Sequence, residues 1–377
     1  MKRAMTRREF MRGMAAGAVG VAAVSVLGGC GGSGSSTSGG SSAAPADNAE
    51  EDPDAGKHIF DQAKADAAEI TLKFANVTTN CSKDAGVYFQ NLINEKSNGR
   101  IYIDLYQDNM LGDDQVATEG VQVGDIAIVV TAASPLVSTW PDYYLYDAPY
   151  LFPDRDAAMN VGMFSDLGRQ IWANDELETR GGLKGVGIWE NGFRNLTNSV
   201  REVKTVADVK GLKLRTMDND VHLAAWKALG ANPSPMAFSE LFTALQQKTM
   251  DGQENPFAII VSNKFFEVQP YISKTEHIYA PHIVLMNPDT YKGLPDDLKA
   301  IFDECMEEAT KKQFEYAISY EQTAVKDCED GGATVTELTA EAKAEFQKVM
   351  VDNDIMGMVK NKMDHPEVLD QMLAAMA

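Results

Sequence analysis

The sequence predicts an α/β fold in which mostly parallel sheets are flanked by helices. Residues 69–130 show the patterns of strand, helix, strand, helix and strand in turn, and residues 183–257 contain further strand–loop–helix units. Such alternation is typical of parallel sheets, because helices make the crossover connections. With 377 residues, 44% of them hydrophobic, the chain is long enough for two domains with cores of their own.

The start of the chain predicts export. Residues 1–29 begin with basic side chains and continue as an apolar stretch shorter than the about twenty residues that span a membrane, so they are expected to be a signal peptide. Thr6–Met11 resembles a twin-arginine signal, with an ordinary basic start as the alternative. Leu27–Cys30 resembles a lipobox, which would make Cys30 the lipidated end of a flexible tether over residues 30–60.

The charge is strongly negative. It is -21 for the whole chain and -25 without residues 1–29, which hold five basic residues and one acid. This disfavours nucleic acid and anionic lipid as partners, and an anionic ligand would have to be captured by local arginines in a cleft. The histidines and cysteines show no metal-ligand spacing, so neither a metal nor a cofactor is expected. Only Cys305 and Cys328 are placed to form a disulfide, and the sequence leaves that question open.

In the first half of the folded chain, segments with the two-residue period of a strand alternate with segments that have the 3.6-residue period of a helix. The expected elements are strands at residues 69–77, 101–105, 126–130 and 183–189, helices at 84–95, 111–121 and 156–172, and a turn at 178–182. Residues 140–152 are rich in aromatic side chains, for which packing in the core is favoured over an aromatic wall beside a cleft.

Residues 211–216 predict a short strand that ends near Arg215. Asp220 is expected to cap a helix over residues 221–229, which stops at Gly230. Arg215 would then lie at the carboxyl end of a strand, the edge at which open α/β sheets bind ligands. Taken alone, a surface salt bridge is the commoner role for such an arginine.

A second strand–helix unit follows. Ser239 is a good N-cap for a helix with an apolar face, and Asp251-Gly252 is a turn signal. Pro256 disfavours the helical region for Asn255, so this asparagine is expected to be extended, with a donor and an acceptor to offer. Beyond it the sequence predicts strands at residues 264–268, 277–286 and 335–338, a long helix at 298–326 and two final helices.

These segments together resemble the substrate-binding subunits of tripartite ATP-independent periplasmic (TRAP) transporters of the dicarboxylate-binding (DctP) type. The resembling segments are Leu111–Asp114, Asp147–Phe152, Phe193–Ser199, Gly211–Arg215, Gly230–Pro233, Pro235–Glu240, Ala244–Gln246, Asp251–Pro256 and Leu294–Leu298. The resemblance covers nearly everything after Ile70.

The resemblance implies a two-lobed fold like that of periplasmic binding proteins. Each lobe would be a mostly parallel sheet flanked by helices, with a ligand cleft between the lobes and a long C-terminal linking helix. Lobe 1 is expected to comprise residues 61–190 with about 281–319, and lobe 2 residues 191–280 with about 320–377.

The resemblance also implies a binding site. Arg215 would pair with a ligand carboxylate, Asn255 would hydrogen-bond it, Phe238 would lie against the ligand and Arg194 would make a supporting contact. A guanidinium suits a carboxylate because it is planar and permanently charged. Without the resemblance, Asn255 would be read as a turn residue and Phe238 as an apolar residue that staples the start of a helix.

Three further site candidates have equally ordinary explanations. Asp114 would lie near the far end of the ligand, or act only as an acid at a helix start. Trp189 and Glu190 would reach the cleft from a strand end, or belong to the core and to a solvent face. Val130–Ser134 lacks the acid that sialic-acid binders carry in this region, which favours a simpler organic acid over a polyhydroxylated one.

The predicted function is that of a lipid-anchored extracytoplasmic solute receptor. It would bind a small organic acid and deliver it to the membrane permease subunits of a TRAP transporter. One alternative is a ligand-sensing subunit of a signalling receptor. Another is an exported hydrolase or lyase, for which Asp251 with Glu254 is the candidate pair of carboxylates, although no GxSxG elbow, catalytic cysteine pair or metal spacing is present.

Overall fold

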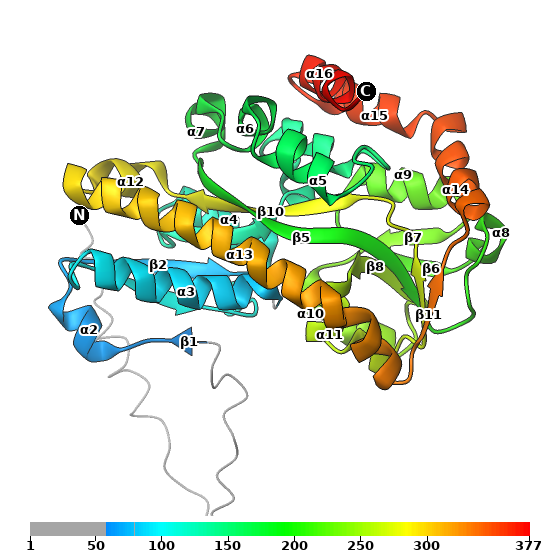
Figure 1. The fold of residues 1–377 in the computed structure, drawn as a ribbon, viewed down its shortest axis with the longest axis horizontal. Helices are drawn as coiled ribbons and strands as arrows, with labels where there is room; N and C mark the ends of the chain where they lie inside the picture. Colours follow the sequence, from blue (N-terminus) through cyan, green and yellow to red (C-terminus); the bar gives the residue numbers. More distant parts are fainter. Residues whose placement is uncertain (1–57, 79) are drawn as a thin grey trace, which may run out of the picture. The chain divides into compact units, whose positions relative to one another are not determined.

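The computed structural model describes residues 58–78 and 80–377 (Figure 1). The predicted signal peptide, Cys30 and nearly all of the predicted tether lie outside these residues. Within the described part of the chain, no helix is both long enough and apolar enough to cross a membrane.

The strands form two parallel sets within one sheet. The strand order is β1-β3-β2-β4-β10-β5-β8-β6-β7, and β9 joins β11 to β5. In the first set β2 pairs in parallel with β3 and β4, and in the second set β6 pairs in parallel with β7 and β8. The strands of the first set are β2 (Ile70–Asn76), β3 (Ile101–Tyr106) and β4 (Ile128–Ala132), and those of the second are β6 (Lys213–Thr216), β7 (Asn232–Pro235) and β8 (Gly252–Pro256). The short β1 (His58–Ile59) pairs antiparallel with β3 at the edge of the sheet.

Two antiparallel strands connect these sets. β10 (Tyr279–Met286) lies between β4 and β5 (Lys184–Asn198), and β5 continues beyond it to pair with β8 and β9 (Tyr271–Lys274). The α/β class is therefore confirmed, with a sheet that is mixed at its centre. The strand predicted at residues 183–189 extends to Asn198, because residues from Arg194 onward pair with β8 and the last three of them also with β9.

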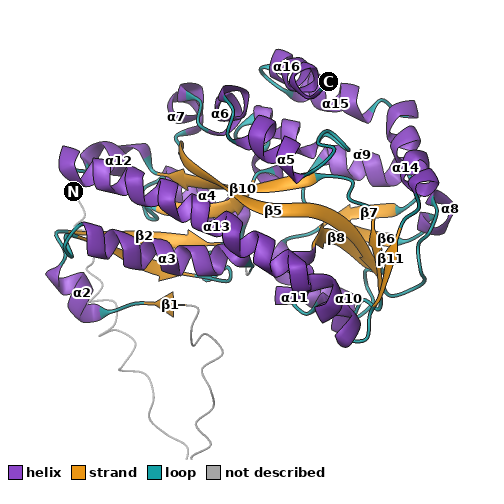
Figure 2. Cartoon of the chain, in the orientation of Figure 1, coloured by secondary structure: helices purple, strands orange, loops and turns teal. Residues whose placement is uncertain are grey.

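Helices cover both faces of the first set (Figure 2). Phe74 of β2 packs in one core with α3 (Cys81–Lys96) and α13 (Asp296–Asp330), whereas the next residue, Ala75, packs in another core with α4 (Asp114–Gln122). Successive side chains of a strand point to opposite faces, so one strand supports both layers.

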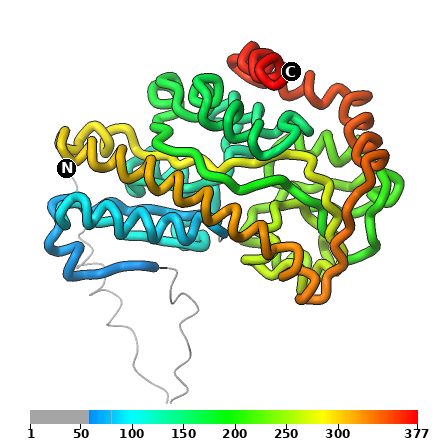
Figure 3. Tube along the Cα trace, viewed as in Figure 1, coloured from blue at the N-terminus to red at the C-terminus, as the bar shows by residue number. Residues whose placement is uncertain are grey.

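The remaining helices contact both sets and the strands between them, and the last three close the chain. They are α2 (Gln62–Ala67), α5 (Arg155–Ala157), α6 (Asp166–Trp172), α7 (Asp175–Gly181), α8 (Val206–Val209), α9 (Asp220–Ala228), α10 (Phe238–Gln246), α11 (Phe257–Ser262), α12 (Pro288–Gly293), α14 (Ala340–Asp352), α15 (Ile355–Lys362) and α16 (Pro366–Met376). Figure 3 traces the end of the chain from α13 through β11 (Thr334–Glu337) to α16, which packs on α6. Three helices, rather than the predicted two, follow β11.

The predicted long helix is confirmed as α13, and it decides the disulfide question. Cys305 and Cys328 both lie on this one continuous helix. Twenty-three residues of α-helix separate them by about 34 Å, too far for a disulfide. The three cysteines in the described residues, Cys81, Cys305 and Cys328, are free and buried.

Several local predictions were wrong. Residues 265–267, expected in a strand, form a 3₁₀ turn, and the expected turn at residues 178–182 falls largely in α7. Asn219, rather than Asp220, caps α9, because its side-chain oxygen accepts from the amides of Val221 and His222. The N-cap of α10 is Ala237, so Ser239 lies inside the first turn.

The aromatic segment at residues 140–152 packs in the core, as predicted. Trp140, Tyr143, Tyr146 and Phe152 are all buried there. Part of it forms the 3₁₀ segment η3 (Pro141–Asp147), which follows η2 (Ser134–Leu136).

We expect Gly252→Ala to lower the free energy of unfolding by about 2 kcal/mol. A methyl group on Gly252 would lie 2.2 Å from the carbonyl oxygen of Thr197, so β8 would have to move away from β5. Gly293→Ala is the matched control, since nothing lies within 4 Å of the added carbon. Urea unfolding of both variants measures the difference, and equal stability of the two would contradict the close approach.

Candidate ligand-binding site

A cavity of about 250 Å³ lies at the end of β6. Its wall comes from the start of α4, from η2, from the end of β6 and from the loop between β7 and α10. The lining residues are Asp113, Asp114, Gln115, Pro135, Arg215, Met217, Asp218, Pro235, Met236, Ala237 and Phe238. Pockets for drug-sized ligands measure roughly 300–1,000 Å³, so this cavity suits a smaller molecule.

Arg215 is a buried cation on the wall of this cavity. Its residue is 3% exposed, and its Nε donates to the carbonyl oxygen of Met236 at 2.9 Å. No carboxylate of the described residues forms an ion pair with it, and its two terminal nitrogens have no hydrogen-bond partner there. Burial lowers the pKa of Arg215 to about 10, with Glu254 opposing this effect, so the side chain stays charged at neutral pH.

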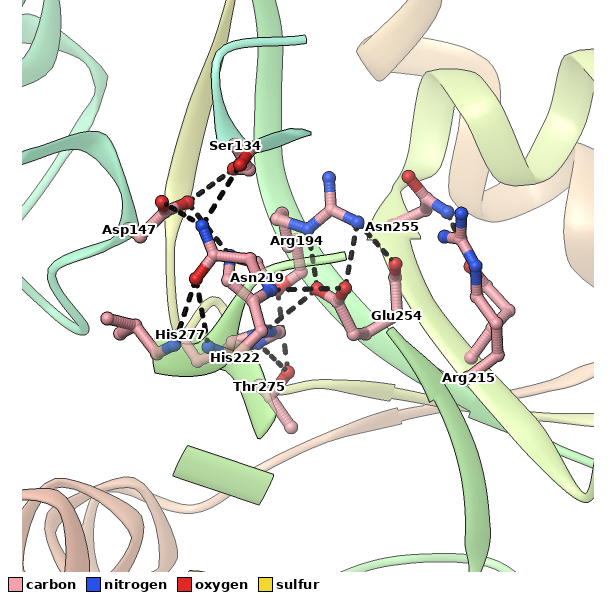
Figure 4. A network of polar contacts seen from close by, with 12 residues as sticks. Ser134, Asp147, Arg194, Arg215, Asn219, His222, Glu254, Asn255, Thr275 and His277 are labelled. Carbon is pink, nitrogen blue, oxygen red and sulfur yellow. Dashed lines mark hydrogen bonds and ion pairs between the residues drawn. The ribbon is translucent and has the colours of Figure 1, made fainter. Parts of the chain in front are cut away.

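The neighbouring strands position this arginine. Arg215 lies opposite Gln253 of β8 and Ser234 of β7 in the parallel ladders. Asn255, two residues further along β8, is extended as predicted and is 4% exposed. Its side-chain nitrogen donates to Gln253 Oε1 at 2.5 Å. Asn255 lies beside Arg215 in Figure 4 but is not among the residues that line the cavity.

Arg194 has a different environment from Arg215. Its Nε lies 2.5 Å from Glu254 Oε2, and its Nη2 donates to Glu254 Oε1 at 2.9 Å and to the carbonyl oxygen of Glu254 at 2.6 Å. Both side chains are almost fully buried. Burial would raise the pKa of Glu254, but Arg194, His222 and His277 hold it well below its usual range. The structure therefore places Arg194 in an internal ion pair rather than on the cavity wall.

Two histidines continue this network (Figure 4). His277 Nε2 lies 3.1 Å from Glu254 Oε2, and His222 Nδ1 lies 3.7 Å from Glu254 Oε1. His222 Nε2 lies 2.9 Å from Asp147 Oδ1. The Asn219 side chain donates to Asp147 Oδ2 at 2.7 Å. The network thus joins η3, before β5 in the chain, to α9 and β8 after it.

Sequence reasoning missed most of this network. In the sequence, Asp147 and Glu254 stand out only as parts of resembling segments or, for Glu254, as a candidate catalytic acid, and nothing marks His222. These residues come from segments far apart in the sequence, so no spacing signals that they meet.

The family model for bacterial extracellular solute-binding proteins, family 7, matches residues 73–353. The chain belongs to this family. A curated relative, the 2,3-diketo-L-gulonate-binding periplasmic protein YiaO of Escherichia coli (strain K12), is 33% identical over 281 residues, which cover 74% of this chain and 84% of that one. The resemblance to TRAP solute-binding subunits is confirmed, and the family is one of transport proteins rather than of enzymes.

Solved structures of solute-binding proteins share the fold. The sugar acid binding protein DctPAm from Advenella mimigardefordensis, in complex with galactonate, has a TM-score of 0.77 at 30% identity and covers 82% of this chain and 98% of that one. A TRAP solute binding protein from Sulfurospirillum deleyianum with bound succinate has a TM-score of 0.76 at 27% identity and covers 81% of this chain and 99% of that one.

Trp189 and Glu190 lie away from the cavity of this family 7 protein. Trp189 is fully buried between β5 and α13, where its Nε1 donates to Thr310 Oγ1 at 3.2 Å. Glu190 is 1% exposed and accepts from Arg155 Nε at 2.8 Å. Burial raises the pKa of Glu190. Trp189 thus packs in the core, and Glu190 is a buried acid paired with the partly exposed Arg155 rather than part of a solvent face.

Of the remaining candidates, two lie on the cavity wall and two do not. Asp114 and Phe238 both line the cavity with Arg215. Asp251 accepts from the amide of Lys213 at 2.8 Å, whereas Glu254 is held by Arg194 and the histidines, so these two carboxylates have separate partners. Among the residues that the structure describes, no group of three or more His, Cys, Asp and Glu side chains is arranged to hold a metal ion.

We expect Glu254→Gln to lower the free energy of unfolding by about 3–5 kcal/mol, because Arg194 would remain charged and buried without a carboxylate. Urea titration of the purified variant measures this change. Glu307→Gln, which removes an exposed acid paired only with Lys311, is the control and should cost little. A similar loss in both variants would show that the buried pair has no special role.

His222 predicts a pH dependence of stability. Burial alone would lower the pKa of His222, but Asp147 and Glu254 raise it to about 9. The folded pKa lies above the unfolded value of about 6.5, so the stabilisation is complete below that pH and is lost as the pH rises through about 9. The stability advantage of the wild type over His222→Gln should therefore shrink by a few kcal/mol across this range.

Urea unfolding at a series of pH values measures this difference. The control is His58→Gln at an exposed histidine. An advantage over His222→Gln that grows with pH would contradict the assignment of a charged His222.

Proposed function

We propose that this protein is the extracytoplasmic receptor of a TRAP transporter and that Arg215 binds the carboxylate of a small organic acid. The observation that carries the proposal is the state of Arg215. It is buried and charged, it has no acidic partner among the described residues, and it lines a cavity of about 250 Å³. A buried charge without a partner is costly, and a bound carboxylate would remove that cost.

The chemistry around Arg215 supports this role. A guanidinium can bind a carboxylate with two parallel hydrogen bonds, and the terminal nitrogens of Arg215 are available for them. The apolar side chains of Phe238, Met217 and Met236 line the same cavity and would pack against the carbon skeleton. Related proteins bind galactonate, succinate and 2,3-diketo-L-gulonate, all of which are organic acids.

Closure of two lobes is the mechanism that we propose. The cavity is lined by residues 113–135 on one side and by residues 215–238 on the other, which fall in the predicted lobes 1 and 2. A ligand that touches both sides favours the closed state by its higher affinity for that state. Asp147 of predicted lobe 1 and His222 of predicted lobe 2 are already in contact without a ligand.

Delivery to membrane permease subunits and attachment by lipid at Cys30 complete the proposal. They rest on the family resemblance and on the sequence before residue 58. The closed receptor would present its ligand to the permease at the outer face of the membrane.

We expect Arg215→Lys to weaken binding of an organic acid by roughly 10- to 100-fold, because lysine can replace only one of two charge-assisted hydrogen bonds. Isothermal calorimetry with a panel that includes succinate, galactonate and pantoate measures the loss. Arg180→Lys is the matched control, since Arg180 is exposed on α7 and forms ion pairs with Glu176 and Asp364. Unchanged affinity in the Arg215 variant would contradict the proposal.

A further inference from the structure

The cavity contains more acid than base. Arg215 is the one basic residue among its lining residues, whereas Asp113, Asp114 and Asp218 contribute three carboxylates. When Arg215 holds the carboxylate of a ligand, the rest of that ligand therefore lies near negatively charged side chains.

Asp114 is the best placed of these acids to contact a ligand. Its Oδ1 accepts from Thr131 Oγ1 at 2.7 Å and from the amide of Ala132 at 3.0 Å. Its Oδ2 has no hydrogen-bond partner in the described part of the chain. By contrast, Asp113 serves as the N-cap of α4 and accepts from the amide of Val116.

The two hydrogen bonds hold the Asp114 carboxylate in place. They come from β4, whereas Asp114 starts α4, so the acid is fixed between two elements of the first strand set. Burial raises the pKa of Asp114, while these hydrogen bonds and the charge of Arg215 lower it in part. A second carboxylate brought into the cavity would thus meet a fixed, partly buried acid.

The position of Asp114 also bears on the segment Val130–Ser134. The sequence of this segment has no acid, which favoured a simple organic acid over a polyhydroxylated one. In the structure the segment binds Asp114, so an acid is present at this wall although another segment supplies it. Its absence from residues 130–134 therefore gives no reason to exclude hydroxylated ligands.

We propose that Asp114 makes this receptor selective for monocarboxylates that carry hydrogen-bond donors away from the carboxylate, and that it rejects dicarboxylates. This inference rests on the proposed role of Arg215. A free carboxylate oxygen accepts hydrogen bonds and donates none, so it favours a hydroxyl or ammonium group and disfavours a second carboxylate. Like charges brought together in a poorly solvated site repel strongly.

A matched series of four-carbon acids tests the selectivity. Each acid has a carboxylate at one end, and the four differ in the groups on the other carbons. Butyrate has none, D-erythronate has hydroxyls, 4-aminobutyrate has an ammonium group and succinate has a second carboxylate. L-galactonate and galactarate form a second pair, of six carbons, with one and two carboxylates. In calorimetry we expect whichever of D-erythronate and 4-aminobutyrate binds more tightly to have at least tenfold higher affinity than succinate and butyrate. We also expect L-galactonate to have at least tenfold higher affinity than galactarate. The comparison of D-erythronate with 4-aminobutyrate shows whether the preferred donor is a hydroxyl or an ammonium group.

Substitution of the acid tests its part in this selectivity. Asp114→Asn keeps an oxygen that can accept from Thr131 and Ala132 but removes the charge. We expect it to reduce the preference for the donor-bearing acid over succinate at least tenfold. Glu119→Gln is the control, because it removes one negative charge from an exposed position on the same helix, and it should leave the preference unchanged. Thermal unfolding of both variants checks that they are folded.

The outcomes separate this inference from the proposed function. If succinate or galactarate binds as tightly as its donor-bearing partner, and Arg215→Lys weakens that binding, the inference is overturned while the role of Arg215 stands. The same conclusion follows if Asp114→Asn and Glu119→Gln leave the preference equally unchanged. If none of these acids binds, both the inference and the proposed function fail.

Discussion

The buried ion pair between Arg194 and Glu254 is the interaction on which the candidate site depends. It joins β5 to β8, next to the strand that carries Arg215. Because Arg194 and two histidines hold Glu254, this carboxylate is not the ion-pair partner of Arg215. Of the two arginines buried in the described part of the chain, Arg194 is the one that pairs with Glu254. The second keeps a charge that a ligand can neutralise.

This arrangement explains how a protein of net charge -21 could recognise an anion. The overall field opposes the approach of a negative ligand, so affinity has to come from short-range contacts in a desolvated cavity. The proposed role of the partly buried Asp114 is the opposite one, the repulsion of a second carboxylate. Charges interact more strongly in such a site than in water. Specific binding sites commonly combine groups that attract the right ligand with groups that repel the wrong one.

Much of the fold follows from local pattern, and the exceptions have identifiable causes. The strands at β2, β3, β4 and β6 and the helices α3, α4, α9 and α13 were predicted because their periodicity is clear. The second half of β5 was missed because β8 and β9, distant in the chain, pair with it. The prediction of a helix cap failed where a neighbouring residue was equally suited, as with Asn219 and Asp220. Asp220 instead accepts a hydrogen bond from Tyr144 and forms an ion pair with Lys362.

The sequence alone determined the family, the α/β class and the place of Arg215 at a strand end, because these rest on contiguous motifs and on local periodicity. Only the tertiary structure decided that Arg194 is internally paired, that Trp189 lies in the core, and that Asp114 and Phe238 share a cavity with Arg215. The reason is physical. Whether a charged side chain is free depends on which distant groups fold against it, and pairing between strands far apart in the chain sets that arrangement.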